Sequence, residues 1–490
     1  MSATNHVDGL VGQAGRRATA GLVVSLVACL GSCATPEPQP APPGQQDTLP
    51  TQPEERFRAL AEAAGHVVQE GALTFATYEG CCDAGADCLG NNPATPYGTY
   101  ALPPSPGEVV AGDDIFAPWG EVPDGLHRDH RLREDEAIVL IGRTPPEVKY
   151  FGLRSYLNTR VDPSTGATEQ LFASLGASLN QLVVAADRGA SVDAIFDKVF
   201  IVVTTADRAV EDRVTEWLVE AGYDPAHVHY DRMTHELARF GVEQGADTFS
   251  VQWRMAVPSD AQALASYQRD PGATVLRITP TAEPTAAEPH PWPVLPEGGS
   301  GDDESHLLGA LRLLQAAVHL HHRGHEVTVM DPDLANVESL TCIPNCGIAD
   351  IHDRFTAKGP FFTLDSDEFV VVYGPNHERT GKASYSSFAF MNEANSYGFL
   401  DVASDEMVGT ARFYLPNHPD ADDLYAYTVA RSCSGHAEPC VEVPTTCPYP
   451  GLDTQMKLTV RAYLEPATGA APIAAELLPD RMTHFRPRPK

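Results

Sequence analysis

Two segments, one in each half of the chain, have the same pattern of apolar residues between turn residues. Residues 132–142 read LREDEAIVLIG and residues 364–374 read LDSDEFVVVYG, with five identities in eleven positions. Near-continuous apolar runs of this length are typical of strands buried on both faces. Three further pairs of segments match in the same order: 144–157 with 380–390, 197–204 with 423–428, and 275–280 with 459–466. We therefore expect an internal duplication.

The first half carries an additional helical segment. Residues 199–204 form an apolar run, residues 206–221 have apolar positions at helical spacing, and Gly222 follows as a helix-ending glycine. Residues 228–230 are the expected returning strand. The predicted fold class is therefore α+β and β-rich, a tandem of two related sandwich-like domains, the first with an inserted strand–helix–strand unit.

Local patterns predict the remaining elements. Helices are expected at 57–69, 259–269 and 304–323, and residues 331–360 are expected to be irregular. Period-two or continuous apolar runs predict strands at 137–141, 148–157, 247–257, 273–279, 368–373, 384–391, 408–415, 424–430 and 457–464.

The charge balance excludes one class of partner. The chain has 66 acidic and 34 basic residues and a formal net charge of −32. A surface this acidic repels phosphate backbones, so no nucleic-acid partner is expected. The sequence contains no GxSxG elbow, Walker A motif or GxGxxG after a strand, so the common hydrolase and nucleotide-binding chemistries have no support.

The N-terminal segment resembles the signal of bacterial lipoproteins. Arg16 and Arg17 precede the apolar run 18–30, which is shorter than the roughly 20 residues that cross a bilayer. Cys29 and Cys33 each end a lipobox-like tetrapeptide. Cleavage before Cys33 leaves eight other cysteines, an even number, whereas cleavage before Cys29 leaves nine. We therefore expect lipidation at Cys33, and the alternative is an ordinary secretory signal.

This resemblance implies an exported protein attached to a membrane of the bacterial cell envelope through an N-terminal lipid. Ala34 follows Cys33 in place of the Asp that would resemble an inner-membrane retention signal, which favours the outer membrane. The expected organisation is a signal peptide at 1–32, a proline-rich tether at 33–55, a first β-rich domain with a disulfide loop and the inserted unit at 56–280, a Pro/Gly linker at 281–304, and a second β-rich domain preceded by a long helix at 305–490.

The remaining cysteines are expected to form disulfides, because exported proteins pair their thiols. They are Cys81, Cys82, Cys88, Cys342, Cys346, Cys433, Cys440 and Cys447. The first three and the last three form clusters with odd counts, so at least one bridge leaves each cluster. The simplest pairing is one local bridge per cluster, a Cys342–Cys346 bridge and one bridge between the clusters.

Two groups of residues are candidate sites. His319, His322 and His325 end the predicted long helix, and Asp331 and Asp333 follow, so together they offer nitrogen and oxygen ligands for a divalent metal. The helical wheel places His321 away from His319, and cations in a last turn also interact with the helix dipole without any further role.

The second group is the polar turn 374–382 with its repeat partner at 142–147. Asn376, His377, Lys382 and Arg143 are possible ligand-binding groups if the two halves face each other across a cleft. The alternative is a hairpin connection with no function.

The sequence favours a lipid-anchored envelope protein that binds an unidentified small-molecule or protein ligand, with no cofactor predicted. The alternative is an exported metal-assisted hydrolase that uses the His-rich helix end and the acidic loop after it. Metal analysis of the purified protein separates these two hypotheses.

Overall fold

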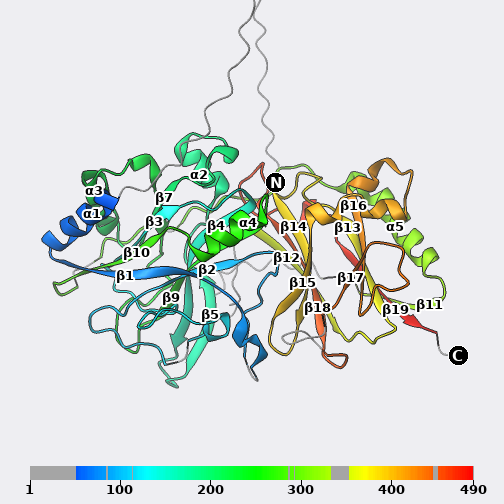
Figure 1. Cartoon of the computed structure of the whole chain (residues 1–490), viewed down its shortest axis with the longest axis horizontal. Helices are drawn as coiled ribbons and strands as arrows, with labels where there is room; N and C mark the ends of the chain where they lie inside the picture. The colour runs from blue at the N-terminus through cyan, green and yellow to red at the C-terminus, as the bar shows by residue number, and fades with distance from the viewer. Residues whose placement is uncertain are drawn as a thin grey trace, which may run out of the picture. The chain divides into compact units, whose positions relative to one another are not determined.

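The computed structural model describes residues 51–83, 86–112, 114–284, 287–291, 293–330, 332, 352–444 and 451–488. The chain divides into two units, Met1–Gln46 and Asp47–Lys490, and the described residues belong to the second. This unit is α+β and β-rich, as predicted, with helices packed around its strands (Figure 1). Among the helices of the residues that the structure describes, none has the length and apolar character needed to cross a bilayer.

The first half is built on a ten-stranded sheet in the order β5-β4-β9-β2-β1-β10-β3-β7-β8, with β6 paired to β4. Strand β1 serves two layers, since its first residues pair with β10 and its last residues pair with β2. The strands are β1 (His66–Phe75), β2 (Tyr97–Ala101), β3 (Ala137–Arg143), β4 (Val148–Val161), β5 (Thr168–Ser174), β6 (Leu179–Asn180), β7 (Val199–Thr205), β8 (Val228–Arg232), β9 (Thr248–Pro258) and β10 (Thr274–Pro280).

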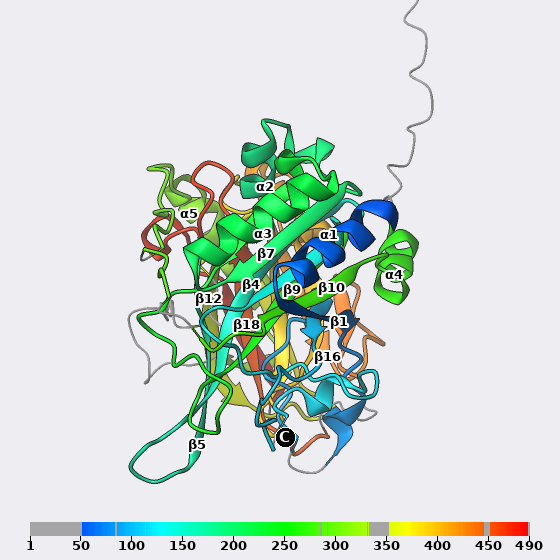
Figure 2. The same ribbon diagram turned by 90° about the vertical axis from the view of Figure 1, so that its left-hand side faces the viewer.

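Two cores follow from the alternation of side chains along these strands. Ile138 and Leu140 of β3 face Phe151 and Trp253 of the other layer and form the sandwich core. Val139 points to the opposite face, which is covered by α1 (Thr51–Ala63) and α3 (Arg208–Ala221) (Figure 2). Because both faces of β3 are buried, its sequence is a continuous apolar run.

The second half consists of two sheets, in the orders β11-β19-β13-β16-β17 and β12-β18-β14-β15. Helix α5 (Leu308–His321) packs on the outer face of the first of them, against Val371 and Phe485. The strands are β11 (His325–Val329), β12 (Arg354–Phe362), β13 (Phe369–Pro375), β14 (Tyr385–Asn392), β15 (Gly398–Ala403), β16 (Leu424–Ala430), β17 (Cys440–Glu442), β18 (Met456–Tyr463) and β19 (Arg481–Pro487).

The two halves have the same strand connectivity. β1-β10-β3-β7-β8 corresponds to β11-β19-β13-β16-β17, and β2-β9-β4-β5 corresponds to β12-β18-β14-β15. Even the parallel pair β7/β8 recurs as the parallel pair β16/β17, among otherwise antiparallel ladders. The tandem of related β-rich halves is therefore confirmed. The halves differ in the connections between these strands: α3 joins β7 to β8 and α4 (Ala261–Arg269) joins β9 to β10, whereas in the described chain no α-helix joins β16 to β17 or β18 to β19.

The fourth pair of matching segments, 275–280 with 459–466, does not lie on equivalent strands, so this part of the predicted duplication was wrong. Strand β10, which contains Arg277, corresponds to β19, whereas residues 459–463 lie in β18, the counterpart of β9. Val139 pairs with Leu276 and Val371 pairs with Thr483, so His484 occupies the position of Arg277. The similarity around Arg461 arises from two unlike strands with the same apolar alternation.

Several local predictions also need correction. The first helix ends at Ala63 and residues 66–69 belong to β1, because Gly65 adopts a left-handed conformation (φ 83°) that breaks the helix. This first helix, α1, starts at Thr51, which lies within the segment 33–55 that was predicted to be a tether. Residues 410–413 form a 3₁₀ turn after the left-handed Gly409, where a strand was predicted. Part of the segment 331–360 is the regular strand β12.

The helices predicted at 206–221, 259–269 and 304–323 agree closely with the structure, whereas α2 (Gln181–Arg188) and α6 (Ser404–Met407) were not predicted. Asp207 caps α3 by accepting hydrogen bonds from the backbone N–H groups of Ala209 and Val210, and Gly222 ends it in a left-handed conformation. Helix α4 (Ala261–Arg269) lies in the predicted segment 259–269. A 3₁₀ turn at Ser305–Leu307 leads into α5.

Two of the expected local disulfides are present, Cys81–Cys88 and Cys433–Cys440. Cys82 is disulfide-bonded as well. The other cysteine predictions, for Cys33, Cys342, Cys346 and Cys447, lie outside the described residues.

Candidate functional site

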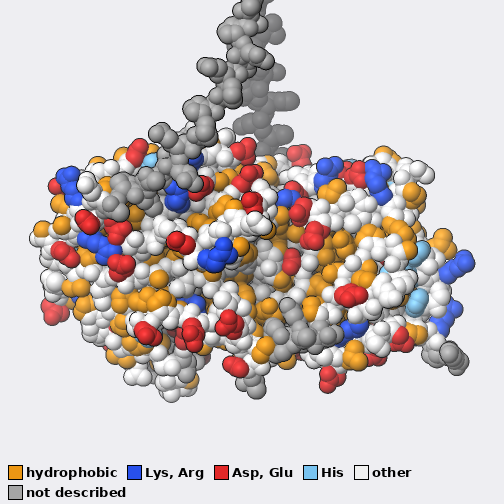
Figure 3. Space-filling model, viewed as in Figure 1, with side chains coloured by type: hydrophobic (Ala, Val, Ile, Leu, Met, Phe, Trp, Pro, Cys, Tyr) orange, Lys and Arg blue, Asp and Glu red, His pale blue; other side chains and the backbone are white. Residues whose placement is uncertain are grey.

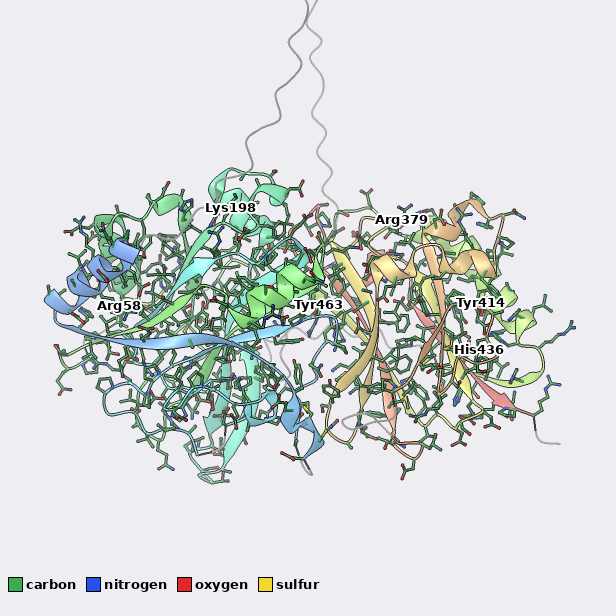
Figure 4. The ribbon with its side chains drawn as sticks, in the orientation of Figure 1. Arg58, Lys198, Arg379, Tyr414, His436 and Tyr463 are labelled. Carbon is green, nitrogen blue, oxygen red and sulfur yellow. A yellow bond between two sulfur atoms is a disulfide. The ribbon has the colours of Figure 1, made fainter. Side chains whose placement is uncertain are left out.

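A cavity of about 250 Å³ lies where the two halves meet. The second half contributes neighbouring positions on β12 and β18, and the first half contributes β5, Tyr97, Trp119 and the loop after the Cys81–Cys88 disulfide. The surrounding contact between the halves is aromatic: the rings of Tyr150 and Tyr463 lie 4.7 Å apart, and Tyr463 lies close to the boundary in Figure 4.

The second-half wall of the cavity is basic. Arg354, Thr356 and Lys358 alternate along β12, and Lys457, Thr459 and Arg461 alternate along β18, so that all six side chains share one face. The antiparallel register places Thr356 opposite Arg461 and Lys358 opposite Thr459. The lining thus contains four cations and one acid, Asp87, in a chain of net charge −32.

Several hydrogen-bond donors at the cavity have no partner among the described residues. Arg461 is 3% exposed, and its Nε and Nη1 atoms make no hydrogen bond. Its Nη2 lies 3.4 Å from the carbonyl oxygens of Gly90 and Asn91. Trp119 Nε1 and Thr356 Oγ1 are also buried without a partner. A buried unpaired donor costs free energy, so this set favours a ligand rich in acceptors.

The electrostatics of the wall favour an anion. Desolvation, followed by repulsion from Lys457, Arg354 and Arg461, lowers the pKa of Lys358 to about 8, although its side chain is exposed at the cavity edge. Desolvation likewise lowers the pKa of Lys457. A bound anion relieves this repulsion, because it supplies the negative charge that the wall lacks.

The first-half wall is apolar and aromatic. Leu89, Tyr97, Trp119 and Phe172 belong to one buried cluster and line the cavity. Arg254 lies behind this wall, 5.4 Å from the ring centre of Tyr97. A cationic wall and an aromatic wall therefore face each other across the cavity. This arrangement suits an anion with an apolar or ring-shaped body.

The disulfide loop of the first half holds the cavity together. The Cys88 N–H donates to the Asn395 carbonyl (2.8 Å), and Asn395 Nδ2 donates to the Cys81 carbonyl (2.9 Å). Asn91 forms two hydrogen bonds with the backbone of Gly398, at 2.7 and 3.1 Å. A Cβ atom on Gly398 would lie 2.4 Å from the Asn91 carbonyl, so this close approach requires glycine.

The four residues predicted to bind a ligand at the polar turns are engaged elsewhere. Arg143 pairs with Asp197 at 2.9 Å, and Asn376 Nδ2 donates to the Ser404 carbonyl at 2.7 Å. Lys382 is buried between Glu465 and Glu476. None of the four lines the cavity.

His377, the fourth of these residues, lies in a buried ionic network. Its Nδ1 is 2.8 Å from Glu304 Oε1 and its Nε2 is 3.2 Å from Asp480 Oδ2. Burial lowers its pKa, but the two carboxylates outweigh this and raise it to about 10. Glu378 of the turn 374–382 forms an ion pair with Lys149, at the start of β4 just after the turn 142–147, at 2.7 Å.

The histidines at the end of α5 form a separate pocket of about 390 Å³ in the second half. His322 and His325 line it, as does His321, which the helical wheel had directed away. His319 lies instead 3.3 Å from Thr483, and Asp331 and Asp333 lie outside the described residues. Burial is the main cause that lowers the pKa of His322 to about 4.

The sequence reasoning missed two residues of this pocket, His436 and Glu438. Both lie in the loop bridged by Cys433–Cys440, and the ring centre of His436 lies 4.9 Å from that of Phe369, which also lines the pocket. The available signal was an H-x-E pattern between two cysteines seven residues apart. Figure 3 shows histidine side chains at the surface of this half.

A third cavity, of about 1170 Å³, lies beside α3 and the segment 290–296. Its lining contains four acids (Asp187, Glu211, Asp212 and Asp353) and two arginines, and one of these, Arg232, pairs with Glu211 at 2.6 Å. This cavity therefore lacks the excess of positive charge that distinguishes the cavity lined by β12 and β18.

Comparison with known proteins adds little. No family model matches the chain, and no curated protein matches it. Among solved structures, the VPA0106 protein of Vibrio parahaemolyticus is 12% identical, with a TM-score of 0.35 over 73% of this chain and 88% of that one. The CBM22 tandem of Paenibacillus barcinonensis Xyn10C is 7% identical, with a TM-score of 0.13 over 86% and 92%. Neither likeness is close enough to carry an argument.

Proposed function

We propose that this protein is a lipid-anchored binding protein of the bacterial cell envelope that holds a small anionic ligand in the cavity between its halves. The observation that carries this proposal is the basic wall formed by Arg354, Lys358, Lys457 and Arg461, with Arg461 buried and two of its nitrogen atoms unpaired. A buried donor without a partner requires an explanation in a native structure, and a ligand that completes the hydrogen bonding provides one.

The chemistry of the walls limits the ligand. The acceptor groups that suit Arg and Lys are carboxylates, sulfates and phosphates. The cavity, about 250 Å³, is smaller than the pockets that hold drug-sized molecules, and one wall is aromatic. The ligand is therefore a small acid with an apolar or ring-shaped body, such as an acidic sugar or an aromatic carboxylate.

The location rests on separate observations. The disulfides Cys81–Cys88 and Cys433–Cys440 are consistent with an oxidising compartment. Acidic side chains are spread over the face shown in Figure 3, which agrees with an exterior that repels nucleic acids. The lipid at Cys33 is tested by labelling: Cys33→Ser abolishes lipid incorporation and releases the protein, and Cys29→Ser does neither.

The binding proposal is tested by calorimetric titration of the mature protein with phosphate, sulfate, citrate and glucuronate, with glucose as the neutral probe. At least one anion binds, its affinity falls as salt is raised, and glucose does not bind. Arg461→Met weakens the anion at least tenfold. The matched control is Arg269→Met, since Arg269 is exposed and does not line the cavity.

Two results would overturn the proposal. One is that none of these anions binds to the wild-type protein. The other is that Arg461→Met binds as tightly as Arg269→Met, because the buried guanidinium would then have no part in recognition.

A further inference from the structure

We propose that His321, His322 and Glu438 form a binding site for a divalent transition-metal ion, Zn²⁺ in the first place, and that His436 positions Glu438 for it. The potential ligand atoms of the three residues all lie within 4.8 Å of one another. His322 Nε2 is 3.6 Å from Glu438 Oε1, and His321 Nε2 is 3.7 Å from Glu438 Oε2.

These separations fit a tetrahedral ion. Bonds of 2.0–2.1 Å from zinc to nitrogen or oxygen place neighbouring ligand atoms about 3.3 Å apart. The two His–Glu separations therefore need to shorten by only a few tenths of an ångström, and the two histidine nitrogen atoms, which lie within 4.8 Å of each other, by at most about 1.5 Å. The hydrogen bond between His322 Nε2 and Tyr414 Oη, at 3.2 Å, is replaced when the metal binds.

The end of α5 explains why two consecutive histidines converge. In a regular helix, neighbouring side chains point about 100° apart. His322 is the C-cap of α5, with φ −98° and ψ 25°, so its backbone has already left the helix. Its ring is fixed by contacts with Phe369 and Phe485, whose ring centres both lie 4.8 Å away. A helical wheel cannot show this arrangement, because it assumes a continuing helix.

The third ligand comes from the loop that replaces α3 in the second half. The Cys433–Cys440 disulfide closes this loop. The Glu438 carboxylate accepts hydrogen bonds from Thr428 Oγ1 (3.2 Å) and the Ala437 N–H (3.0 Å), and lies 2.7 Å from His436 Nδ1. Such outer partners orient a ligating carboxylate. His436 is therefore assigned a positioning role.

The chemical types of the three ligands indicate which metal ions the site can bind. Two imidazoles and one carboxylate suit zinc and other first-row transition metals, whereas calcium and magnesium require mainly oxygen ligands. Three protein ligands leave a fourth tetrahedral position, which opens into the pocket of about 390 Å³. The His321 side chain is 42% exposed, so an ion can reach the site from solvent.

The site is independent of the anion cavity. No residue lines both pockets, and the ligands all belong to the second half. The equivalent connection in the first half is α3, so this site is a property of one copy of the repeat.

The test measures zinc in the untagged mature protein with its disulfides intact, by elemental analysis and by competition with a chromophoric chelator. The wild-type protein binds one Zn²⁺ per chain. His321→Gln and Glu438→Gln each weaken zinc at least 100-fold, and His436→Gln weakens it by about 10- to 100-fold. The matched control, His319→Gln, changes a histidine of the same helix that lies outside the pocket and leaves zinc affinity unchanged.

Because His321 is partly exposed, its substitution leaves the core intact and the variant folds. Cobalt provides a second readout: the wild-type protein and His319→Gln give the absorption of tetrahedral Co²⁺, and His321→Gln does not. The proposal is refuted if the wild-type protein binds less than one equivalent of zinc, or if His321→Gln and Glu438→Gln bind it as tightly as His319→Gln.

Discussion

Glu136 and Glu368 hold the same position in the two halves, one residue before the central strand of each helix-covered sheet. Glu136 pairs with Arg277 at 3.0 Å, and Glu368 pairs with His484 at 2.9 Å. Since Arg277 and His484 also occupy equivalent register positions, the duplication has kept an acid–base pair while changing the base.

The two pairs differ in how far they are charged. The side chains of Glu136 and Arg277 are fully buried, and Arg277 also contacts Glu108 at 2.7 Å. Burial raises the pKa of Glu136, but Arg277 more than offsets this and lowers it below its usual value. Burial and Arg486 instead lower the pKa of His484, so this pair is held by a neutral imidazole near pH 7.

Glu136→Gln is therefore expected to cost much more stability than Glu368→Gln. The first substitution breaks a buried ion pair and costs about 3–5 kcal/mol. The second removes a hydrogen bond to a largely neutral histidine and costs about 0.5–1.5 kcal/mol. Urea unfolding of each variant measures the difference, and equal losses would show that the two pairs carry the same charge.

The pH dependence of stability provides a test of His377. Its pKa in the folded protein, about 10, lies above the value of about 6.5 in an unfolded chain. The protonated imidazole therefore stabilises the fold fully below pH 6.5, and this contribution is lost as the pH rises toward 10. The difference in unfolding free energy between the wild-type protein and His377→Gln is expected to be largest at pH 6 and to shrink steadily up to pH 10. A difference that stays constant over this range would mean that His377 is neutral in the fold.

Arg461 is expected to lower the free energy of unfolding of the ligand-free protein. Its guanidinium is buried with two nitrogen atoms unpaired, and Met has a similar length without the charge. Arg461→Met therefore raises the free energy of unfolding by about 0.5–2 kcal/mol while it weakens anion binding at least tenfold. Thermal unfolding with and without ligand measures both effects. Simple destabilisation by this substitution would identify Arg461 as a structural residue.

Strands buried on both faces were predictable from sequence, because the runs at 137–141 and 368–373 need no knowledge of their neighbours. The basic cavity between the halves was not predictable from sequence. The alternation R-x-T-x-K at 354–358 and K-x-T-x-R at 457–461 has the pattern of two strands with one solvated face. This face lines a cavity only because the first half packs against it. The sequence of neither strand indicates that contact.

The polar turns were misread for a related reason. Polar residues on a turn suggest a site, but Asn376 and Lys382 satisfy buried partners that come from distant segments, such as Ser404 and Glu465. Likewise His436 and Glu438 meet α5 only after β16 and β17 have paired. Sequence spacing therefore identified half of the histidine pocket and could not identify the rest.

Lys358 is expected to make anion binding depend on pH. Its pKa of about 8 means that it carries a charge below pH 8 and loses it above. Anion affinity is therefore expected to be higher at pH 6.5 than at pH 9.5, and Lys358→Met removes most of this difference. Lys198→Met, which changes a lysine outside the cavity lining, keeps it. The prediction fails if both variants show the wild-type profile in calorimetric titrations.

The two described disulfides form a matched pair for the last prediction. Each closes a loop with a sequence separation of seven, so replacing either one with two serines is expected to lower the free energy of unfolding by a similar amount, about 2.5 kcal/mol, through the entropy of the unfolded chain.

The effects of the two replacements on ligand binding should differ. Loss of Cys81–Cys88 loosens the loop that holds Asn91 and the cavity wall, so anion affinity falls and zinc affinity is unchanged. Loss of Cys433–Cys440 releases the loop that carries His436 and Glu438, so zinc affinity falls and anion affinity is unchanged. Calorimetric titration of both double variants with both ligands gives the four values, and parallel losses of the two affinities in either variant would show that the sites are coupled through the fold.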